Sequence, residues 1–210
     1  RDNEGENISS KNKSYCELTT QYWAWKNMDA DYYGFCHYRR FFSFNREEIP
    51  ETVWGTIEYD YLDDAAIKEL HFNERDMENY INNYDFLIAK GISINSLGAS
   101  SVYEHYKNAS ELHIEDVDIL LEIIKEKYPY LSESAEEYFQ GKVFFPCNMF
   151  IMKKEVFHTY SAILFDLLDE FEKRADMSEY SREGYRTTGH LGERITGIYY
   201  LYLQKQKKYR

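Results

Sequence analysis

Two clusters of charged residues in this chain of 210 residues have the composition of an anion-binding site. The first is the HYRR run at His37–Arg40, which follows a short aromatic stretch. The second is the GHLGER run at Gly189–Arg194, which opens the last helical segment. Arginine side chains grip a diphosphate bidentately, which lysine does less well. A glutamate at a helix start can serve as a general base, or it can simply stabilise the helix dipole.

In the HYRR run, His37, Arg39 and Arg40 are candidate contacts to a diphosphate. Adjacent residues of a strand point to opposite faces, so one of the two arginines can face a cleft while the other faces away. The alternative is that an arginine pairs structurally with one of the many carboxylates. Arg186, in the loop before the last helix, and Arg194 are further cations that could close over a phosphate.

The polar lead-in Gly5-x-Asn7-Ile8-Ser9-x-x-Asn12 supplies a second set of candidates. Amides and a hydroxyl before a helix start can recognise sugar hydroxyls, a base edge or a phosphate. Lys26, further along the same helical segment, could add a positive charge. The alternative is an ordinary capped helix with a polar lead-in.

Four more residues are candidates for contacts to a second substrate. Tyr103, His105 and Tyr106 form a polar aromatic cluster that could touch an acceptor or belong to a surface helix. Asn148 lies in an apolar run, so its carboxamide either bonds to backbone or meets a ligand.

Two DxD sequences, Asp29-x-Asp31 and Asp116-x-Asp118, could hold Mg²⁺ or Mn²⁺ with a nucleotide diphosphate. The alternative for both is a solvated charged face. The sequence therefore does not decide whether the protein binds a divalent metal ion.

The elements that must position these residues follow from hydrophobic periodicity. Tyr15, Leu18, Tyr22 and Trp25 form one apolar helical stripe after a capping box at Ser14 and Glu17. Predicted helices span 14–27, 76–84, 101–108, 115–128, 132–140, 155–174 and 190–205, and predicted strands span 32–38, 85–89 and 143–152. Pro146 interrupts the last strand, and 91–101 is a predicted loop. Strands alternating with helices indicate one α/β domain.

The composition excludes several classes of protein. With 37 acidic and 25 basic side chains, the formal net charge is -12, which argues against a general nucleic-acid binder but not against one small anionic ligand. The three cysteines have no CxxC spacing and indicate reduced thiols in a cytoplasmic protein. The aromatic run at 198–203 is followed by basic residues, which suggests peripheral contact with the inner face of the plasma membrane. The alternative is that this run belongs to an ordinary buried helix.

The motifs GENISSKNKSYCELTTQYWAWKN at 5–27 and YGFCHYRR at 33–40 resemble a bacterial family of capsular and exopolysaccharide biosynthesis proteins regarded as glycosyltransferases. The resemblance implies a GT-A-like α/β fold with a mixed central sheet flanked by helices, as a single domain over residues 1–210. Family members carry an extra strand upstream, so we expect the chain to be truncated at its N-terminus.

The resemblance also implies substrates and roles. It implies a nucleotide-sugar donor, with a UDP-sugar favoured, and an oligosaccharide or lipid-linked saccharide acceptor. Gly192-Glu193-Arg194 is a loose counterpart of a Gly-x-Glu-Asp motif, which makes Glu193 the catalytic base. The HYRR run stands where related folds carry DxD. The leading hypothesis is a hexosyltransferase-type enzyme of capsule or exopolysaccharide synthesis, and the alternative is a non-catalytic carbohydrate- or nucleotide-sugar-binding module.

Overall fold

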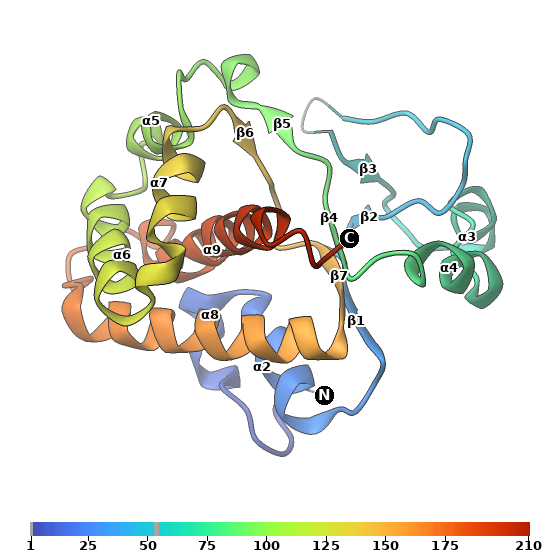
Figure 1. The fold of residues 1–210 in the computed structure, drawn as a ribbon, viewed down its shortest axis with the longest axis horizontal. Helices are drawn as coiled ribbons and strands as arrows, with labels where there is room; N and C mark the ends of the chain where they lie inside the picture. Colours follow the sequence, from blue (N-terminus) through green and yellow to red (C-terminus); the bar gives the residue numbers. More distant parts are fainter. Residues whose placement is uncertain (1, 53–54) are drawn as a thin grey trace.

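A small antiparallel sheet lies between a layer of helices and a separate excursion of the chain (Figure 1). The computed structural model describes residues 2–52 and 55–210. Within them, the central sheet has the order β1 (Tyr32–Phe35), β7 (Phe150–Lys153) and β4 (Phe86–Ile88). Gly34 of β1 and Leu87 of β4 both pair with Ile151, and both pairings are antiparallel. The predicted mixed sheet is therefore wrong for the described residues.

This topology determines where the functional residues can meet. β1 and β4 run in the same direction on either side of β7, so both end where β7 begins. Residues that follow β1, residues that follow β4 and residues that precede β7 are therefore brought to one end of the sheet. The predicted candidates His37–Arg40 and Asn148 fall at this end.

Two short ribbons extend from the sheet. In the excursion, β2 (Arg40–Phe41) pairs with β3 (Ile57–Glu58), followed by α3 (Asp64–Glu69) and α4 (Glu74–Ile81). In the second ribbon, β5 (Ile92–Ser93) pairs with β6 (Val143–Phe144). Figure 1 shows the excursion and the main helices on opposite sides of the central sheet.

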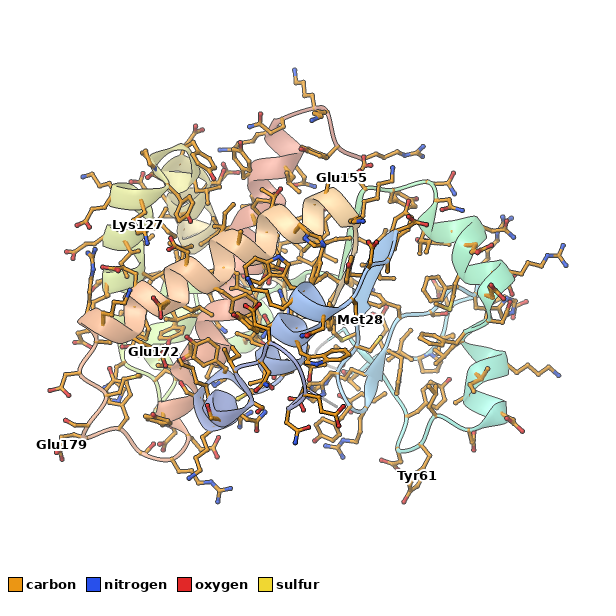
Figure 2. The ribbon with its side chains drawn as sticks, turned by 90° about the horizontal axis from the view of Figure 1, so that it is seen from below. Met28, Tyr61, Lys127, Glu155, Glu172 and Glu179 are labelled. Atoms are coloured by element: carbon orange, nitrogen blue, oxygen red, sulfur yellow. The ribbon has the colours of Figure 1, made fainter. Side chains whose placement is uncertain are left out.

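Aromatic packing joins the sheet to the helix α8 (Lys154–Arg174), which continues directly from β7. Tyr33 of β1 stacks on Phe157 with 4.1 Å between ring centroids. Further along α8, Trp25 stacks on Phe165 with 5.8 Å between ring centroids, and Figure 2 shows α2 (Leu18–Asn27) beside α8. Among the described residues, six tyrosines are buried in the core: Tyr15, Tyr33, Tyr106, Tyr138, Tyr160 and Tyr199.

The remaining helices surround α9 (Thr187–Lys205), which packs beside α8. They are α5 (Val102–Asn108), α6 (Ile114–Lys127) and α7 (Ser132–Gln140), with short 3₁₀ turns at η2 (Ile94–Leu97), η3 (Pro129–Leu131) and η4 (Gly184–Arg186). These helices, together with α4, α8 and β4, confirm the corresponding predicted elements to within a few residues. The predicted strand 143–152 is two strands, β6 and β7, and the predicted loop 91–101 contains β5 and η2.

The predicted helix over 14–27 is wrong in one respect that matters for the site. It is divided into η1 (Ser9–Lys11) with α1 (Asn12–Tyr15) and then α2, because Cys16 adopts φ 52° and interrupts the helical hydrogen bonds. Ser14 does not cap a helix here. Its hydroxyl instead bonds to that of Thr188 at the start of α9, so the break is fastened to α9.

Among the described residues, no helix has the length and apolar character needed to cross a membrane. Ile198, Tyr199 and Leu203 are buried in the core, and Lys205 pairs with Glu133 and Glu137. These side chains are therefore not available as the predicted membrane-contact surface.

The close approach of α9 to α7 yields a stability prediction. A Cβ added at Gly197 would lie 2.4 Å from Cε2 of Tyr138, a residue that is 1% exposed and whose ring would have to shift within the core. We expect Gly197→Ala to lower the free energy of unfolding by about 1–3 kcal/mol, although alanine favours a helix by about 1 kcal/mol over glycine. Urea denaturation measures the change. Combined with Tyr138→Leu, the loss should be smaller than the sum of the two single losses, and strict additivity would exclude this clash as the cause.

Candidate functional site

A cavity of about 180 Å³ lies at the end of the sheet where β1 finishes and β7 begins. We call it the inner pocket. It collects side chains from the α1–α2 break, the segment after β1, the segment before β7 and the first turns of α9. Its lining residues are Cys16, Glu17, His37, Arg40, Cys147, Arg186, Gly189, His190 and Glu193.

The backbone around the inner pocket is strained. Cys16, Cys147 and Asn148 have φ of 52°, 75° and 48°, in the region that L-residues seldom occupy. Such conformations cost free energy and persist where the surrounding structure holds them, which is frequently at functional sites. Here they bend the chain so that polar groups of a short loop point into the pocket.

The Cys147–Asn148 corner connects two carboxylates of the pocket. The amide N–H of Cys147 donates to Oε1 of Glu193 at 2.7 Å. Nδ2 of Asn148 donates to Oε1 of Glu17 at 2.8 Å and to the carbonyl of Gly189 at 3.2 Å. Asn148 thus acts inside the protein, where it ties the α1–α2 break to the start of α9.

Glu193 has the environment of a carboxylate that can accept a proton. Its side chain is 16% exposed, and its Oε2 accepts from Nη1 of Arg194 at 2.7 Å. Burial raises the pKa of Glu193, the neighbouring Arg194 opposes that rise, and the charge of Glu17 adds to it. A carboxylate with a raised pKa is a better general base than an exposed one.

The two arginines of the HYRR run lie in different places. Arg40 lines the inner pocket. Its Nε donates to Oε1 of Glu58 at 2.7 Å, and its Nη1 donates to Sγ of Cys147 at 3.4 Å. Arg39 is exposed, with its guanidinium 4.8 Å from the ring centroid of Tyr38 and its Nη2 donating to the hydroxyl of Tyr38 at 2.8 Å. Only Arg40 can therefore meet a ligand in the pocket.

Arg186 supplies the second cation, and its Nε donates to Sγ of Cys16 at 3.3 Å. The two histidines of the pocket add no positive charge at neutral pH. Burial, Arg194 and Arg186 lower the pKa of His190 to about 4, and burial and Arg40 lower the pKa of His37. The positive charge of the inner pocket therefore rests on Arg40 and Arg186.

The predicted lead-in residues do not line the inner pocket. Asn7 accepts from the amide and the hydroxyl of Ser9 at 3.2 and 2.9 Å, so the two residues stabilise their own turn. Asn12 donates to the carbonyl of Cys16 at 3.0 Å and so supports the α1–α2 break. Lys26 lies 3.8 Å from the ring centroid of Trp25. These contacts are structural.

The predicted acceptor cluster on α5 also lies outside the inner pocket. Tyr106 is 0% exposed and its hydroxyl bonds to that of Thr187 at 2.8 Å, so the prediction that Tyr106 touches an acceptor is wrong. Tyr103 donates to Asp118 at 2.9 Å, and the ring of His105 packs 5.5 Å from that of Phe144.

Arg194 is a supporting residue and does not line the pocket. It is 2% exposed, and its guanidinium lies 4.6 Å from the ring centroid of Phe144 and 5.1 Å from that of Tyr106. In this position, Nη1 of Arg194 donates to Oε2 of Glu193 although Arg194 itself does not line the pocket. The prediction that Arg194 contacts a donor is wrong, because its buried side chain is enclosed by protein.

Neither DxD sequence forms a metal site in the structure. Asp29 pairs with Lys154 at the surface, and Asp116 is buried, where it accepts from Tyr180 at 2.7 Å and Thr187 at 2.5 Å. In the part of the chain that the structure describes, no group of three or more histidine, cysteine or acidic side chains is arranged to hold a metal ion.

Five lining residues were not among the predicted site residues: Cys16, Glu17, Cys147, Gly189 and His190. The sequence pattern predicts Glu17 as part of a helix cap. The residue type of Cys16 gives no indication that its φ is positive. His190 stood in the GHLGER run, but its depressed pKa depends on two arginines that only the fold brings together.

The pKa of His190 makes stability depend on pH in a definite direction. An unfolded histidine titrates near 6.5, whereas folded His190 titrates at about 4, so between these values only the unfolded chain takes up the proton. Wild-type stability should therefore decrease as the pH falls through this window, and His190→Gln should lack that part of the decrease. Denaturation of both proteins at pH 7.5 and pH 4.5 measures the difference, and an equal loss in both would show that His190 titrates normally.

Comparison with known proteins identifies a solved structure with the same fold. The structure of WbbM, described as a bifunctional glycosyltransferase in its apo form, superposes with a TM-score of 0.93 at 36% sequence identity. The match covers 98% of this chain and 36% of the WbbM chain, so this chain spans about a third of that protein. The fold is therefore glycosyltransferase-like.

No curated protein matches the sequence. The family model described as "Domain of unknown function (DUF4422)" matches residues 1–206. Because that match spans nearly the whole chain, this protein belongs to the DUF4422 family.

Proposed function

We propose that this chain is a glycosyltransferase domain whose inner pocket holds the diphosphate of a nucleotide-sugar donor. The observation that carries the proposal is the presence of two arginines, Arg40 and Arg186, in one small pocket with a half-buried glutamate, Glu193. The likeness to WbbM, a bifunctional glycosyltransferase, supports the same class of reaction.

The volume of the inner pocket indicates which part of the donor it can hold. The inner pocket measures about 180 Å³. Pockets for complete drug-sized ligands measure about 300–1,000 Å³. The inner pocket therefore suits the reacting end of the donor, where the sugar joins the diphosphate, and the remainder lies outside it.

The reaction proposed is a displacement at the anomeric carbon. The acceptor oxygen forms a bond to that carbon, the bond from the carbon to the diphosphate oxygen breaks, and the electron pair leaves with the diphosphate. Arg40 and Arg186 stabilise the negative charge that develops there. Glu193 takes the proton of the acceptor hydroxyl.

The finer features of the proposal rest on the resemblance of residues 5–27 and 33–40 to polysaccharide-synthesis proteins. They are a UDP-sugar as donor, a hexosyl group as the part transferred, and an oligosaccharide or lipid-linked saccharide of capsule or exopolysaccharide synthesis as acceptor at the cytoplasmic side of the membrane. Asp116, the one buried member of the two DxD sequences, is occupied by Tyr180 and Thr187, which favours cationic arginines over a metal at the diphosphate.

A second candidate function is donor binding without catalysis. The observation that favours it is that both oxygens of Glu193 already accept hydrogen bonds, from the amide of Cys147 and from Arg194. A glutamate used in this way could serve only to hold the pocket together.

Adjacent arginines in opposite environments give a matched test of diphosphate binding. We expect Arg40→Ala to weaken binding of uridine, guanosine or thymidine diphosphate about 10- to 100-fold, because it removes a charge that faces the phosphates. Arg39→Ala removes the same charge one residue away, where it faces solvent, and should change affinity less than about twofold. Isothermal titration calorimetry measures both. Equal effects of the two substitutions would refute the assignment of the diphosphate to the inner pocket.

Substitution of Glu193 separates the two candidate functions. Glu193→Gln keeps the shape and can still accept from the Cys147 amide, but it removes the base. We expect turnover of a donor sugar to fall about 10²- to 10⁴-fold while nucleoside diphosphate affinity stays within a few-fold. Product release is measured by coupled assay over a panel of donors. Wild-type donor binding with no turnover on any donor would favour the non-catalytic module, and near-normal turnover of Glu193→Gln would exclude Glu193 as the base.

A further inference from the structure

A second and larger cavity, of about 750 Å³, lies at the same end of the sheet as the inner pocket. We call it the outer cavity. The chain passes from one to the other twice, because Arg40 of the inner pocket is followed by Phe41 of the outer cavity, and Cys147 is followed two residues later by Met149. The amide of Ala89, just after β4, donates to the carbonyl of Met149 at 3.1 Å and fixes the wall between them. A molecule in the outer cavity would therefore lie next to the reacting end of the donor.

The walls of the outer cavity combine apolar surface with carboxylates. Phe41, Phe42, Ile49, Pro50 and Met149 supply apolar surface, and Tyr80 of α4 adds an aromatic ring. Sugar rings present C–H faces that pack on such surfaces, and their hydroxyls donate to carboxylates and amides. The cavity also lies in the size range of sites that enclose small ligands.

The outer cavity differs from the inner pocket in charge, because the lining of the inner pocket balances Arg40 and Arg186 against two glutamates. Glu47, Glu48 and Glu51 line it together with one cation, Lys90. Lys90 pairs with Glu51 at 2.6 Å, and within residues 2–52 and 55–210 neither Glu47 nor Glu48 forms an ion pair. The uncompensated charge is therefore negative, which repels phosphates and uronates and attracts uncharged or amino-bearing molecules.

We propose that the outer cavity binds the acceptor saccharide, and that it selects uncharged or amino sugars over acidic ones. The inference rests on the proposed function, since it takes the inner pocket as the donor diphosphate site. It moves the acceptor from the cluster at Tyr103–Tyr106 to the excursion between β2 and α4. The alternative occupant of the outer cavity is the nucleoside of the donor. Because the nucleoside is covalently bonded to a negatively charged diphosphate, the negative charge of the outer cavity disfavours it relative to an uncharged saccharide.

The test compares binding of three disaccharides of equal length and different charge, measured by saturation-transfer NMR on the intact chain. Lactose is neutral, the glucosamine disaccharide is cationic and digalacturonate is acidic. We expect lactose and the glucosamine disaccharide to bind at least tenfold more tightly than digalacturonate. Glu47→Lys combined with Glu48→Lys should reduce or reverse that preference. Both glutamates are exposed, so the fold should persist, and thermal unfolding checks that it does.

A matched control is Glu78→Lys combined with Glu122→Lys, which makes the same change in charge at exposed positions outside the outer cavity and should leave the preference unchanged. Three results would overturn the inference: no binding of the neutral or amino disaccharide at millimolar concentration, equal affinity for digalacturonate, or a tenfold gain in uridine diphosphate affinity in the Glu47, Glu48 variant but not in the control. The last would place the nucleotide in the outer cavity. Disaccharide binding without any nucleoside diphosphate binding would refute the proposed function and leave the saccharide site standing.

Discussion

The hydrogen bonds of the Cys147–Asn148 corner are the interaction on which the site depends. Two consecutive residues at positive φ turn the chain just before β7. This turn directs the Cys147 amide to Glu193 and the Asn148 carboxamide to Glu17 and to the Gly189 carbonyl. Without it, the start of α9 and the break between α1 and α2 would have no common partner. The cost of the strained backbone is offset by hydrogen bonds to charged groups, which are stronger than those between neutral groups.

The antiparallel sheet explains why two distant motifs share one pocket. β1 and β4 flank β7 and end where it begins, so the HYRR run and the Cys147–Asn148 corner meet at that end. The corner then holds the start of α9, and Ser14 bonds to Thr188 there as well. The outer cavity forms at the same end because the chain leaves β1 through the β2–β3 ribbon. A protein with a formal charge of -12 thus gathers two arginines at one place and leaves carboxylates at the next.

The sequence was informative where local rules apply. The periodicity of α6, α7 and α8 placed these helices, since their apolar stripes face one core. The sequence predicted that only one of Arg39 and Arg40 faces a cleft, but the reason is different: Arg39 lies in a tight turn closed by the bond from the Arg40 amide to the His37 carbonyl, and not in an extended strand. Glu193 could be singled out because a glutamate in the first turns of a helix is visible in the residues themselves.

The sequence did not predict those features of the site that depend on contacts between residues far apart in the chain. The break at Cys16 depends on bonds from Ser14 to Thr188 and from Arg186 to Cys16, which join residues 174 and 170 positions apart. The burial of Tyr106 depends on α9 lying against α5, and residue type does not distinguish a core tyrosine from one that stacks on a sugar. The antiparallel order of the sheet follows from pairings that no local pattern encodes.

The most direct test is a crystal structure of the chain in complex with uridine diphosphate. Our account predicts that phosphate oxygens lie within hydrogen-bonding distance of the Arg40 guanidinium, on the side of the inner pocket that faces Glu193. A diphosphate bound elsewhere, for example on Asn7 and Ser9 of the lead-in with Arg40 still facing Cys147, would contradict it.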